Sequence, residues 1–452
     1  MRVAVIDIGK TNAKLVLIDT ETGAALASLS LPNRVVAAGP YPHADTEALW
    51  RFILDGLRNL AAEHGFDAIS ITTHGATAAL VDEDRLVLPV LDYEHDGPEA
   101  MRDAYEAMRP PFADSLTPRL PNGLNLGAQL FWQQLEFEAE FTRARHILTY
   151  AQYWAWRLTG IAASEVTSLG CHTDLWSHPD ADISSLVVQM NWRDKFPPLR
   201  PAHDVLGPLR REFCEAIGLA GPVPVACGIH DSNASLLPHL AREQAPFSVV
   251  SAGTWTICMT VGGDPSRLDS TRDSLGNVDA FGRTVPTARF MGGREFDLLA
   301  GTPPVKAGDA DLETVLARGI QVLPGLMPGV GPYPKAPGGW TVDETLLTPG
   351  ERHAAASLYL ALVTETCLEL CGLGHTIIVE GPLARNAIYC RALARWTGVL
   401  VRPSADATGT SLGAALLFGG GSPIADEAPV TPFGPEIDAY RASWREKVSA
   451  FL

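Results

Sequence analysis

The sequence predicts an α/β protein built from two related domains with a cleft between them. Strand-like and helix-like segments alternate after an opening β-meander, which is typical of a mixed α/β sheet. A pattern of strand, glycine turn and strand over residues 1–19 recurs over residues 247–261. Such a repeat indicates duplicated domains, and 452 residues are enough for two or three of them. We therefore expect domains over residues 1–243 and 244–452.

The opening stretch is predicted to be a β-hairpin. Apolar and polar residues alternate on both sides of Gly9, as in two half-buried strands joined by a tight turn. A glycine lets backbone N–H groups approach an anion. Neighbouring donors and cations are Lys10, Thr11, Asn12 and Lys14. Asp7 ends the first strand, where a carboxylate could hold a hydrated cation. An ordinary hairpin with a solvated turn explains the same pattern without a ligand.

The run Gly9-Lys10-Thr11 also imitates the end of a phosphate-binding P-loop. That motif requires a further glycine at a position where this chain has Ala4, and it requires a helix directly after the loop. Here a second strand follows the turn instead. We therefore reject a P-loop.

The composition is that of a globular protein with an acidic surface. Hydrophobic residues make up 46% and charged residues 19% of the chain, and the formal net charge is −17. Most of such a surface would repel a nucleic acid, although a local pocket could still take a small anion. The N-terminus enters a strand at once, unlike a signal peptide, and no apolar run approaches the ~20 residues of a membrane span. We expect a cytoplasmic protein without nucleic-acid or membrane partners.

Seven cysteines stand at irregular spacing without a CxxC motif, which favours free thiols in a reducing compartment. Cys367 and Cys371 are four residues apart on an apolar helical pattern and could face one metal ion. Such a pair is more often part of a hydrophobic core. We favour the core interpretation.

The first half continues with alternating elements. Asp45 or Thr46 can cap a helix whose apolar residues fall on one face and which ends at Gly65. Residues 92–121 are charged and proline-rich, and we expect an irregular excursion there. The further expected strands are 24–31, 68–73 and 223–227, and the further expected helices are 126–141, 150–158 and one that begins near Ser232.

The second half is expected to begin with the repeated hairpin and to continue through a loop-rich region, 262–350. A long helix over 353–371 should follow, ending at Gly372 or Gly374. The remaining expected elements are a strand over 376–380, a helix over 384–396, a strand over 399–402 and a last helix after Gly409.

Several motifs occur in an order that resembles the FGGY family of carbohydrate kinases. They are the turn Asp7-Ile8-Gly9, GIHDSNAS (228–235), SAGTW (251–255), and EGPLARN (380–386) followed by SADATGTSLGAA (404–415). The resemblance runs from Asp7 to about Phe418 and is greatest to the rhamnulokinase branch, with some kinship to fuculokinases. It implies two ribonuclease-H-like domains of the actin and hexokinase type, with ATP and sugar in a cleft that closes to exclude water.

The resemblance assigns the catalytic base to Asp231, which would take the proton from the sugar hydroxyl. A positioned base contributes typically ~10²–10⁴-fold to the rate. Asp231 also fits a helix N-terminal cap, because Ser232 follows it in the first turn. Both roles can hold at once, since a helix N-terminus favours an ionised carboxylate. By the same resemblance, Gly9–Lys14 faces the γ-phosphate and Gly253-Thr254 faces the β/γ region.

Further cofactor-binding residues follow from the resemblance. Gly381-Pro382 stands between a strand and a helix and can lie flat against adenine or ribose, and Asn386 and Gly409 match positions that line the nucleotide. Packing and helix capping explain the same residues without a ligand. Mg²⁺ prefers a few carboxylates together with water and phosphate oxygens, so Asp7 and Asp231 are the expected metal pair.

The expected sugar contacts are less uniform. Candidates are His74, Gly75, Tyr93, His95, His230, Asp231 and Arg294, with Glu94, Arg289 and Glu295 on weaker grounds. A histidine at a strand end is also often structural. The chain departs from the family pattern at Lys10, where a small residue is usual, at Glu94-His95-Asp96, where Asp-x-Arg is usual, and at His74, where rhamnulokinases often have an aromatic residue. Lys10 could contact the γ-phosphate or point to solvent.

The resemblance implies an ATP-dependent kinase for a ketose, such as the deoxyketoses L-rhamnulose or L-fuculose. Other sugars and polyols, including xylulose, ribulose, glycerol and erythritol, stay open, as does a homodimer. A non-catalytic nucleotide or sugar sensor is an alternative that the carboxylate at 231 disfavours. Gly409-Thr410-Ser411-Leu412-Gly413 matches the GxSxG elbow of hydrolases, but the preceding strand ends several residues too early.

Overall fold

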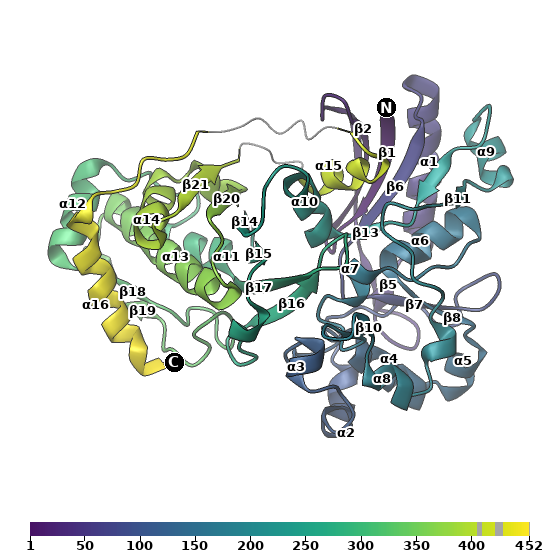
Figure 1. Cartoon of the computed structure of the whole chain (residues 1–452), viewed down its shortest axis with the longest axis horizontal. Helices are drawn as coiled ribbons and strands as arrows, with labels where there is room; N and C mark the ends of the chain where they lie inside the picture. Colours follow the sequence, from purple (N-terminus) through teal and green to yellow (C-terminus); the bar gives the residue numbers. More distant parts are fainter. Residues whose placement is uncertain (405–408, 421–427, 452) are drawn as a thin grey trace. The chain divides into compact units, whose positions relative to one another are not determined.

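The computed structural model describes residues 1–404, 409–420 and 428–451, which divide into two compact units (Figure 1). The first unit contains residues 1–243 together with 276–284 and 409–420. All other described residues belong to the second unit. Each unit contains a sheet with helices, as expected of the predicted α/β class. Two stretches from the second half of the chain therefore complete the first unit.

The first unit is built on a mixed sheet with the strand order β11–β12–β6–β1–β2–β3. Strands β1 (Arg2–Ile8) and β2 (Asn12–Asp19) form the predicted hairpin, and β3 (Ala25–Pro32) continues the meander. β6 (Ala68–Thr73) then runs parallel to β1, and every residue of β6 is buried. The remaining strands are β11 (Val205–Pro208), β12 (Pro224–Ala226) and β13 (Ile229–His230), which also pairs with β6.

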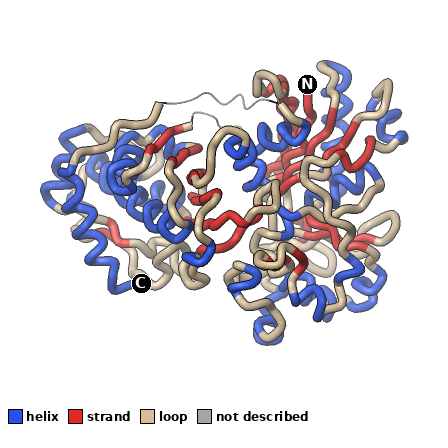
Figure 2. Tube along the Cα trace, in the orientation of Figure 1, coloured by secondary structure: helices blue, strands red, loops and turns tan. Residues whose placement is uncertain are grey.

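Helices pack at the sides of this sheet (Figure 2). Helix α1 (Thr46–Glu63) begins after Asp45, whose side chain accepts a 2.9 Å hydrogen bond from the N–H of Ala48, as a capping residue does. Its buried residues recur at helical spacing on one face, as predicted. The sheet is also packed by α6 (Tyr150–Thr159), α10 (Asp231–Leu240) and α15 (Gly409–Ala415).

A second layer of short elements fills the rest of the first unit. Residues 92–121 are largely irregular, as expected, but contain the short helices α2 and α3. The elements of this layer are β4 (Val35–Val36), β5 (His43–Ala44), β7 (Ala78–Val81), α2 (Arg102–Glu106), α3 (Phe112–Ser115), α4 (Leu126–Glu136), α5 (Glu138–Arg143), β8 (His146–Thr149), α7 (Val166–Leu169), β9 (Trp176–Ser177), β10 (Asp182–Ile183) and α8 (Ser185–Gln189). Helix α9 (Arg211–Ile217) instead packs on α1 beside the sheet.

The second unit repeats the opening hairpin, as predicted. Strands β14 (Phe247–Ala252) and β15 (Thr256–Val261) are antiparallel, and β20 (Thr376–Glu380) runs parallel to β14. The sheet continues through β17 (Thr284–Phe290) on one side and β21 (Leu400–Pro403) on the other. Both hairpins therefore place a glycine turn next to the carboxyl end of a parallel strand.

Helix α13 (Pro349–Cys371) forms the core of the second unit. It begins four residues before the predicted start, because Thr348 and Glu351 form a reciprocal capping box and Pro349 occupies the first position. It ends at Gly372, as predicted. Our expectation of no apolar run near membrane-spanning length was wrong here, since α13 has the length and hydropathy of a span. However, 94% of that window is buried inside the protein, as in a core helix.

The region 262–350 is more structured than predicted. It contains β16 (Ser274–Val278), β17, α11 (Gly292–Ala300), α12 (Asp309–Arg318), β18 (Val322–Leu323) and β19 (Gly339–Trp340). Its many glycines and prolines end these elements without excluding them. Helix α14 (Ala387–Thr397) follows β20, and α15 is not the last helix, because α16 (Asp438–Val448) packs near the C-terminus.

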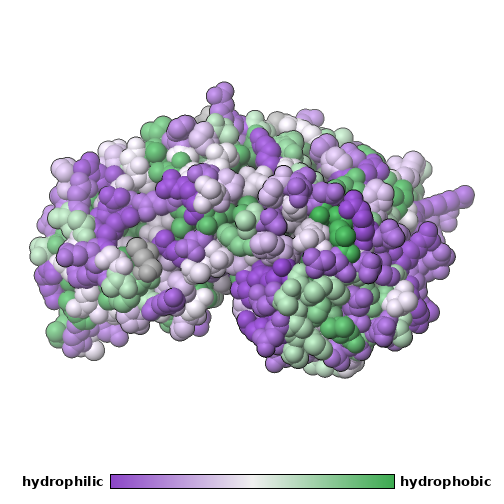
Figure 3. Space-filling model, turned by 60° about the horizontal axis from the view of Figure 1, so that its bottom comes forward, coloured by the Kyte–Doolittle hydropathy of each residue, from purple (hydrophilic) through white to green (hydrophobic). Residues whose placement is uncertain are grey.

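The surface carries hydrophobic and hydrophilic residues side by side. On the face shown in Figure 3, hydrophobic residues are scattered among hydrophilic ones. All seven cysteines lie within the described residues, are buried and form no disulfide, as predicted. Cys367 and Cys371 are fully buried, and burial raises the pKa of both thiols well above the usual value. Protonated thiols in an apolar core are poor metal ligands, which agrees with the core interpretation.

Candidate active site

Three strands of the first sheet end side by side. In the parallel pairing with β6, Ile8 of β1 lies opposite Thr73, and His230 of β13 lies opposite the same residue from the other side. The residues that follow these positions must therefore share one edge of the sheet. Ligands of parallel sheets bind at this carboxyl edge. The fold thus brings together the Gly9 turn, His74 and Asp231, which lie far apart in sequence.

The turn of the first hairpin is held by its own backbone and by Asn33. The N–H of Gly9 donates to the carbonyl of Asn12 at 2.9 Å, and the Asn33 side chain donates to the carbonyl of Gly9 at 2.8 Å. Thr11, Asn12 and Lys14 are exposed, and Lys14 pairs across the hairpin with Asp7. The predicted phosphate turn therefore has a backbone held in place by hydrogen bonds, and these exposed side chains are accessible as hydrogen-bond donors.

Asp231 is the first residue of α10, and His230 occupies the N-cap position. One carboxylate oxygen of Asp231 accepts a 2.6 Å hydrogen bond from the N–H of Ser232 and lies 3.3 Å from Nε2 of His230. Its side chain is 34% exposed, so a ligand can reach it. Burial raises the pKa of Asp231, whereas a charged His74 and the bonds from Ser232 act in the opposite direction. A raised pKa makes this carboxylate a stronger proton acceptor.

His230 is buried behind Asp231. Burial lowers the pKa of His230 to about 4, so the ring is neutral at physiological pH. Its Nε2 lies 3.3 Å from a carboxylate oxygen of Asp231. Its backbone N–H donates to the Thr167 hydroxyl at 3.0 Å. Gly75 makes room for the ring, because a Cβ there would lie 2.6 Å from Nε2. His230 is thus placed to support Asp231.

Asp7 has a partner that the sequence did not reveal. The hydroxyl of Ser411 on α15 donates to Oδ2 of Asp7 at 2.8 Å. Burial raises the pKa of Asp7, the bond from Ser411 lowers it, and the charge of Asp231 raises it further. Two carboxylates that repel each other at one sheet edge suit a divalent cation with oxygen ligands. Among the residues that the structure describes, no group of three or more acidic, histidine or cysteine side chains is arranged to hold a metal ion by itself.

The predicted sugar contacts of the first unit separate into two groups. The His74 ring packs against Tyr93, with ring centres 5.6 Å apart, and against Tyr150 at 5.2 Å. Burial lowers the pKa of His74. His95 instead belongs to an aromatic cluster, with its ring centre 5.4 Å from that of Trp132 and 6.4 Å from that of Tyr41. The structure therefore joins His74 and Tyr93 to the sheet edge and places His95 against the neighbouring layer.

His172 is a neighbour of this site that sequence reasoning missed. It has a left-handed backbone with φ of 44°, and its Nδ1 lies 2.9 Å from the carbonyl oxygen of Leu124. Its ring meets His230 edge-on, with ring centres 6.5 Å apart. A non-glycine residue held at positive φ is more common at functional sites. The sequence around His172 carries no motif that would have indicated it.

The second unit has its own glycine-lined edge. Ser251 of β14 pairs with Glu380 of β20, so the turns that follow these strands are neighbours. Gly381 has φ of 77°, and a Cβ there would lie 1.9 Å from the carbonyl oxygen of Ala252. A Cβ on Gly293 would likewise lie 2.1 Å from the carbonyl oxygen of Gly253. Glycine is therefore required for the close packing of these turns.

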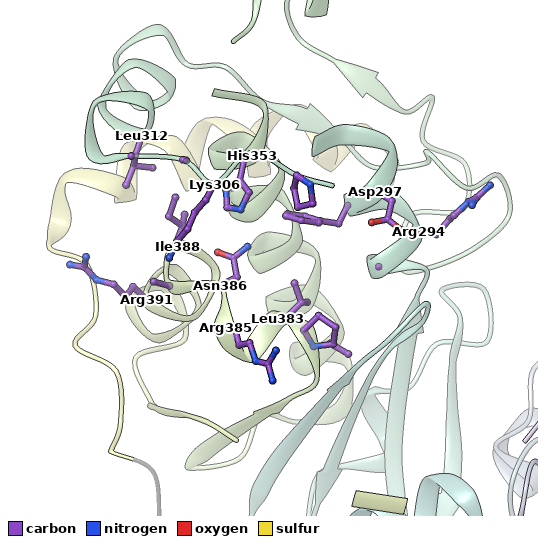
Figure 4. A pocket seen from close by; sticks show the side chains of 18 of the residues that line it. Arg294, Asp297, Lys306, Leu312, His353, Leu383, Arg385, Asn386, Ile388 and Arg391 are labelled. Atoms are coloured by element: carbon purple, nitrogen blue, oxygen red, sulfur yellow. The ribbon is translucent and has the colours of Figure 1, made fainter. Parts of the chain in front are cut away.

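A cavity of 790 Å³ opens beside these turns (Figure 4). Gly253, Thr254, Pro382 and Asn386 line it, as do apolar residues and several cations. The apolar part includes Phe296, Leu312, Leu383 and Ile388, and the basic residues are Arg294, Lys306, Arg385 and Arg391. Such a cavity can hold a flat base on its apolar wall and anionic groups near the glycine turns.

The other predicted nucleotide residues take different places. Asn386 caps α14 by accepting from the N–H of Tyr389 at 3.1 Å, and its amide donates to Ser357 at 2.8 Å. Gly409 begins α15 in the first unit, and residues 405–408 of the same motif lie outside the described residues. Arg294, a predicted sugar contact, lies at the margin of the cavity and points away from Asn386 in Figure 4.

The hydrolase elbow does not form. Ser411 is the third residue of α15, it is buried, and its hydroxyl is engaged by Asp7. An elbow would instead expose its serine on the sharp turn between a strand and a helix. The glycine of the same motif, Gly413, packs against α10, because a Cβ there would lie 1.7 Å from the carbonyl oxygen of Ala234. The GxSxG pattern here reflects helix packing.

Comparison with known proteins supplies an independent line of evidence. A model described as "FGGY family of carbohydrate kinases, N-terminal domain" matches residues 2–238, and one described as "Carbohydrate kinase FGGY, C-terminal domain" matches residues 244–427. The L-fuculokinase of Escherichia coli K12 is 24% identical over 446 residues, which cover 92% of this chain and 91% of that protein.

Solved structures agree with this assignment. A carbohydrate kinase from Novosphingobium aromaticivorans is 38% identical, with a TM-score of 0.91 over 99% of this chain and 98% of its own. A xylulose kinase from Rhodospirillum rubrum is 19% identical, with a TM-score of 0.81 over 100% of this chain and 98% of its own. The second likeness concerns the fold alone.

Proposed function

The chain belongs to the FGGY family of carbohydrate kinases, and we propose that it transfers the γ-phosphate of ATP to a hydroxyl of a deoxyketose, L-fuculose or L-rhamnulose. It is a phosphotransferase that acts on a small sugar. The curated relative that matches most of the chain is an L-fuculokinase, which supports L-fuculose as the first candidate. The same fold serves kinases of other sugars, so the fold does not favour one sugar.

The observation that carries the proposal is the position of Asp231. It combines an accessible carboxylate, a pKa raised by burial and a location beside Asp7 and the glycine turn at one sheet edge. We assign it as the general base that accepts the proton of the attacking hydroxyl. The neutral ring of His230 would orient this carboxylate without neutralising it.

We assign Mg²⁺ to Asp7 and Asp231, because the charge of Asp231 already raises the pKa of Asp7 and a cation would relieve that repulsion. When bound, the ion neutralises charge on the phosphates. Ser411 keeps Asp7 oriented and favours its ionised form. Thr11, Asn12 and Lys14, the exposed residues of the first hairpin, are proposed to lie near the γ-phosphate, with Gly9 shaping the backbone of the turn. Lys10 is not assigned to the phosphate, because its ammonium group is ion-paired with Asp92.

For the nucleotide we propose the cavity of the second unit. Gly253 and Thr254 would meet the phosphates, and Pro382 and Asn386 would border the adenosine, with Gly381 bringing the turn of Pro382 close to that of Gly253. The cavity volume of 790 Å³ falls in the range of small-ligand sites. Gly409 starts the helix that carries Ser411, so we propose an indirect contribution through Asp7.

For the sugar we propose the surroundings of Asp231 in the first unit. His74, Gly75, Tyr93 and His230 are joined there by ring packing and by the space that Gly75 leaves. His95 and Arg294 stay predictions as sugar contacts. The seven buried cysteines, all within the described residues, form no disulfide, which supports a reducing compartment, and we propose the cytoplasm.

The test is ADP release with Mg·ATP against L-fuculose, L-rhamnulose, xylulose, ribulose, glycerol and erythritol. We expect turnover with a deoxyketose and a loss of ~10²–10⁴-fold in kcat for Asp231→Asn. Asp45→Asn is the matched control. Asp45 caps the N-terminus of α1, which is the role that Asp231 would have at α10 if it were a cap and not the base, and Asn caps a helix as well as Asp does. It should keep full turnover.

Three outcomes would overturn all or part of the proposal. If nucleotide binds but no sugar or polyol stimulates ADP release, the chain acts as a nucleotide or sugar sensor. If turnover occurs and Asp231→Asn retains it, Asp231 serves as a residue of the helix N-terminus and another group is the base. Turnover with xylulose or glycerol alone would replace the deoxyketose by that substrate.

A further inference from the structure

Lys10 stands in the first glycine turn, but its side chain is directed to the segment that follows Leu91. Its ammonium group forms an ion pair with Asp92 and lies 3.6 Å from Oε2 of Glu94. It also lies 4.5 Å from the ring centre of Tyr93, within the range of a cation–π interaction. Three consecutive residues of one loop therefore surround the same ammonium group.

The contact is largely withdrawn from water. The Lys10 side chain is 22% exposed and the Asp92 side chain 9%. Ion pairs at such depth are weakly screened, and the loss of one partner leaves the other charge poorly solvated. The carboxylate of Asp92 also accepts a hydrogen bond from the N–H of Glu94 at 3.3 Å. Removing the lysine should therefore disturb the loop, beyond a change of surface charge.

The loop that Lys10 holds is linked to Asp231 through His74. Tyr93 packs edge-on against His74, and His74 interacts electrostatically with Asp231. The cavity that Lys10, His74 and Tyr93 help to line measures 20 Å³, about the room of one water molecule. Lys10, Tyr93 and His74 are thus closely packed, and a displacement of Lys10 would be transmitted through Tyr93 to His74.

The same pairing leaves Lys10 poorly suited to a phosphate. Its charge is balanced by Asp92 and Glu94, whereas Lys14 on the same hairpin is exposed and faces Asp7 across the strands. We propose that Lys10 is a positioning residue for the sugar. Through Asp92 and Tyr93 it joins the glycine turn of the first hairpin to the loop of residues 92–94 beside His74. This inference rests on the proposed function of the sheet edge.

A double-mutant cycle tests the coupling. Lys10→Met keeps the aliphatic stem over Tyr93 and removes the charge, and Asp92→Asn removes the opposite charge. We expect each change to raise the KM for the sugar by roughly tenfold, with kcat and the KM for ATP within about twofold, as for an interaction equivalent to about 1.4 kcal/mol. The double variant should be no worse than either single one. Lys10→Arg should restore most of the sugar affinity.

Lys14→Met is the matched control with the opposite signature. It lies on the same hairpin, lacks the contact with the loop, and should raise the KM for ATP more than that for the sugar. The inference is overturned if Lys10→Met behaves like Lys14→Met, if the effects of Lys10→Met and Asp92→Asn add, or if neither changes the sugar KM.

Calorimetric dissociation constants of the sugar repeat the cycle without turnover. They separate this inference from the proposed function, which fails if the wild-type protein releases no ADP with any sugar. The thermal midpoint of each variant shows that it is folded. A variant that unfolds is replaced by Lys10→Gln or Asp92→Ser, to which the same criteria apply.

Discussion

The hydroxyl of Ser411 donates a 2.8 Å hydrogen bond to Oδ2 of Asp7, a residue 404 positions earlier in the sequence. The bond exists because α15 leaves the second half of the chain and packs in the first unit, against α10 and β1. The Thr410 hydroxyl meets Ser235 of α10 at 2.7 Å, and Ser70 of β6 donates to the carbonyl of Ala414 at 2.6 Å. These contacts fix Ser411 against the carboxylate that we propose as a metal ligand.

Replacing Ser411 by alanine should weaken metal-dependent turnover. A hydrogen bond to a charged group contributes about 1.5–3 kcal/mol, so we expect kcat/KM to fall roughly 10- to 100-fold and more Mg²⁺ to be needed. The bond lowers the pKa of Asp7, and without it that pKa rises. The acid limb of the pH–rate profile should therefore move to higher pH. Steady-state rates over a range of Mg²⁺ concentrations and pH values measure both effects.

Thr410→Ala is the control for this change, because Thr410 lies on the same helix but contacts Ser235 in place of Asp7. Thr410→Ala should lower the thermal stability but leave the acid limb of the pH–rate profile nearly in place. An acid limb that stays in place in Ser411→Ala would show that Asp7 does not control the reaction through its ionisation.

Gly253 provides a test of the proposed nucleotide site. Its backbone does not require glycine, since its φ is not in the left-handed region and a Cβ would meet only the carbonyl oxygen of Trp255, at 3.8 Å. Because Gly253 lines the cavity, the added methyl of Gly253→Ala should obstruct a phosphate. We expect an unchanged thermal midpoint and a KM for ATP raised roughly tenfold or more.

Gly293→Ala serves as the contrasting variant. Its Cβ would lie 2.1 Å from the carbonyl oxygen of Gly253, so we expect it to lower the thermal midpoint, as overpacking does. If Gly253→Ala binds ATP as the wild type does, the phosphates do not pass over this turn.

Local patterns predicted the elements of the sheets well. The alternation around Gly9 predicted β1 and β2, and the buried run of β6 was predicted to the residue. The repeated hairpin at Gly253 is also present, as are the caps at Asp45 and Gly372. These features depend on residues a few positions apart, which is the range over which sequence patterns act.

The missed features depend on distant contacts. The pairings of Ser411 with Asp7 and of Lys10 with Asp92 arise only when separate strands and helices meet. The region 262–350 is rich in glycine and proline, which predicted loops, whereas α11 and α12 are stabilised by packing on α13. The residue types near Asp231 could be predicted from the motif, but their geometry could not.

Glu165 is a completely buried carboxylate that is linked to the backbone of His230 through the hydroxyl of Thr167. It accepts from the Thr167 hydroxyl at 2.6 Å, from the Thr167 N–H at 2.9 Å and from the Ser168 N–H at 3.1 Å. The Thr167 hydroxyl in turn accepts from the N–H of His230, which precedes Asp231. Burial raises the pKa of Glu165 to about 7 despite these bonds.

Glu165→Gln should therefore make stability less dependent on pH. The folded carboxyl group holds its proton to about pH 7, while the unfolded one loses it near pH 4.5, so the wild type loses up to about 3 kcal/mol as pH rises through this window. The advantage of Glu165→Gln over the wild type, measured from urea midpoints, should grow from pH 5 to pH 8. Burial lowers the pKa values of His178 and His230 to about 4, so these two residues destabilise the folded protein in the opposite direction, as pH falls below about 6.5. Their contribution is common to both proteins and cancels in the difference. A difference that stays constant from pH 5 to pH 8 would mean that Glu165 is ionised throughout and that its hydrogen bonds outweigh its burial.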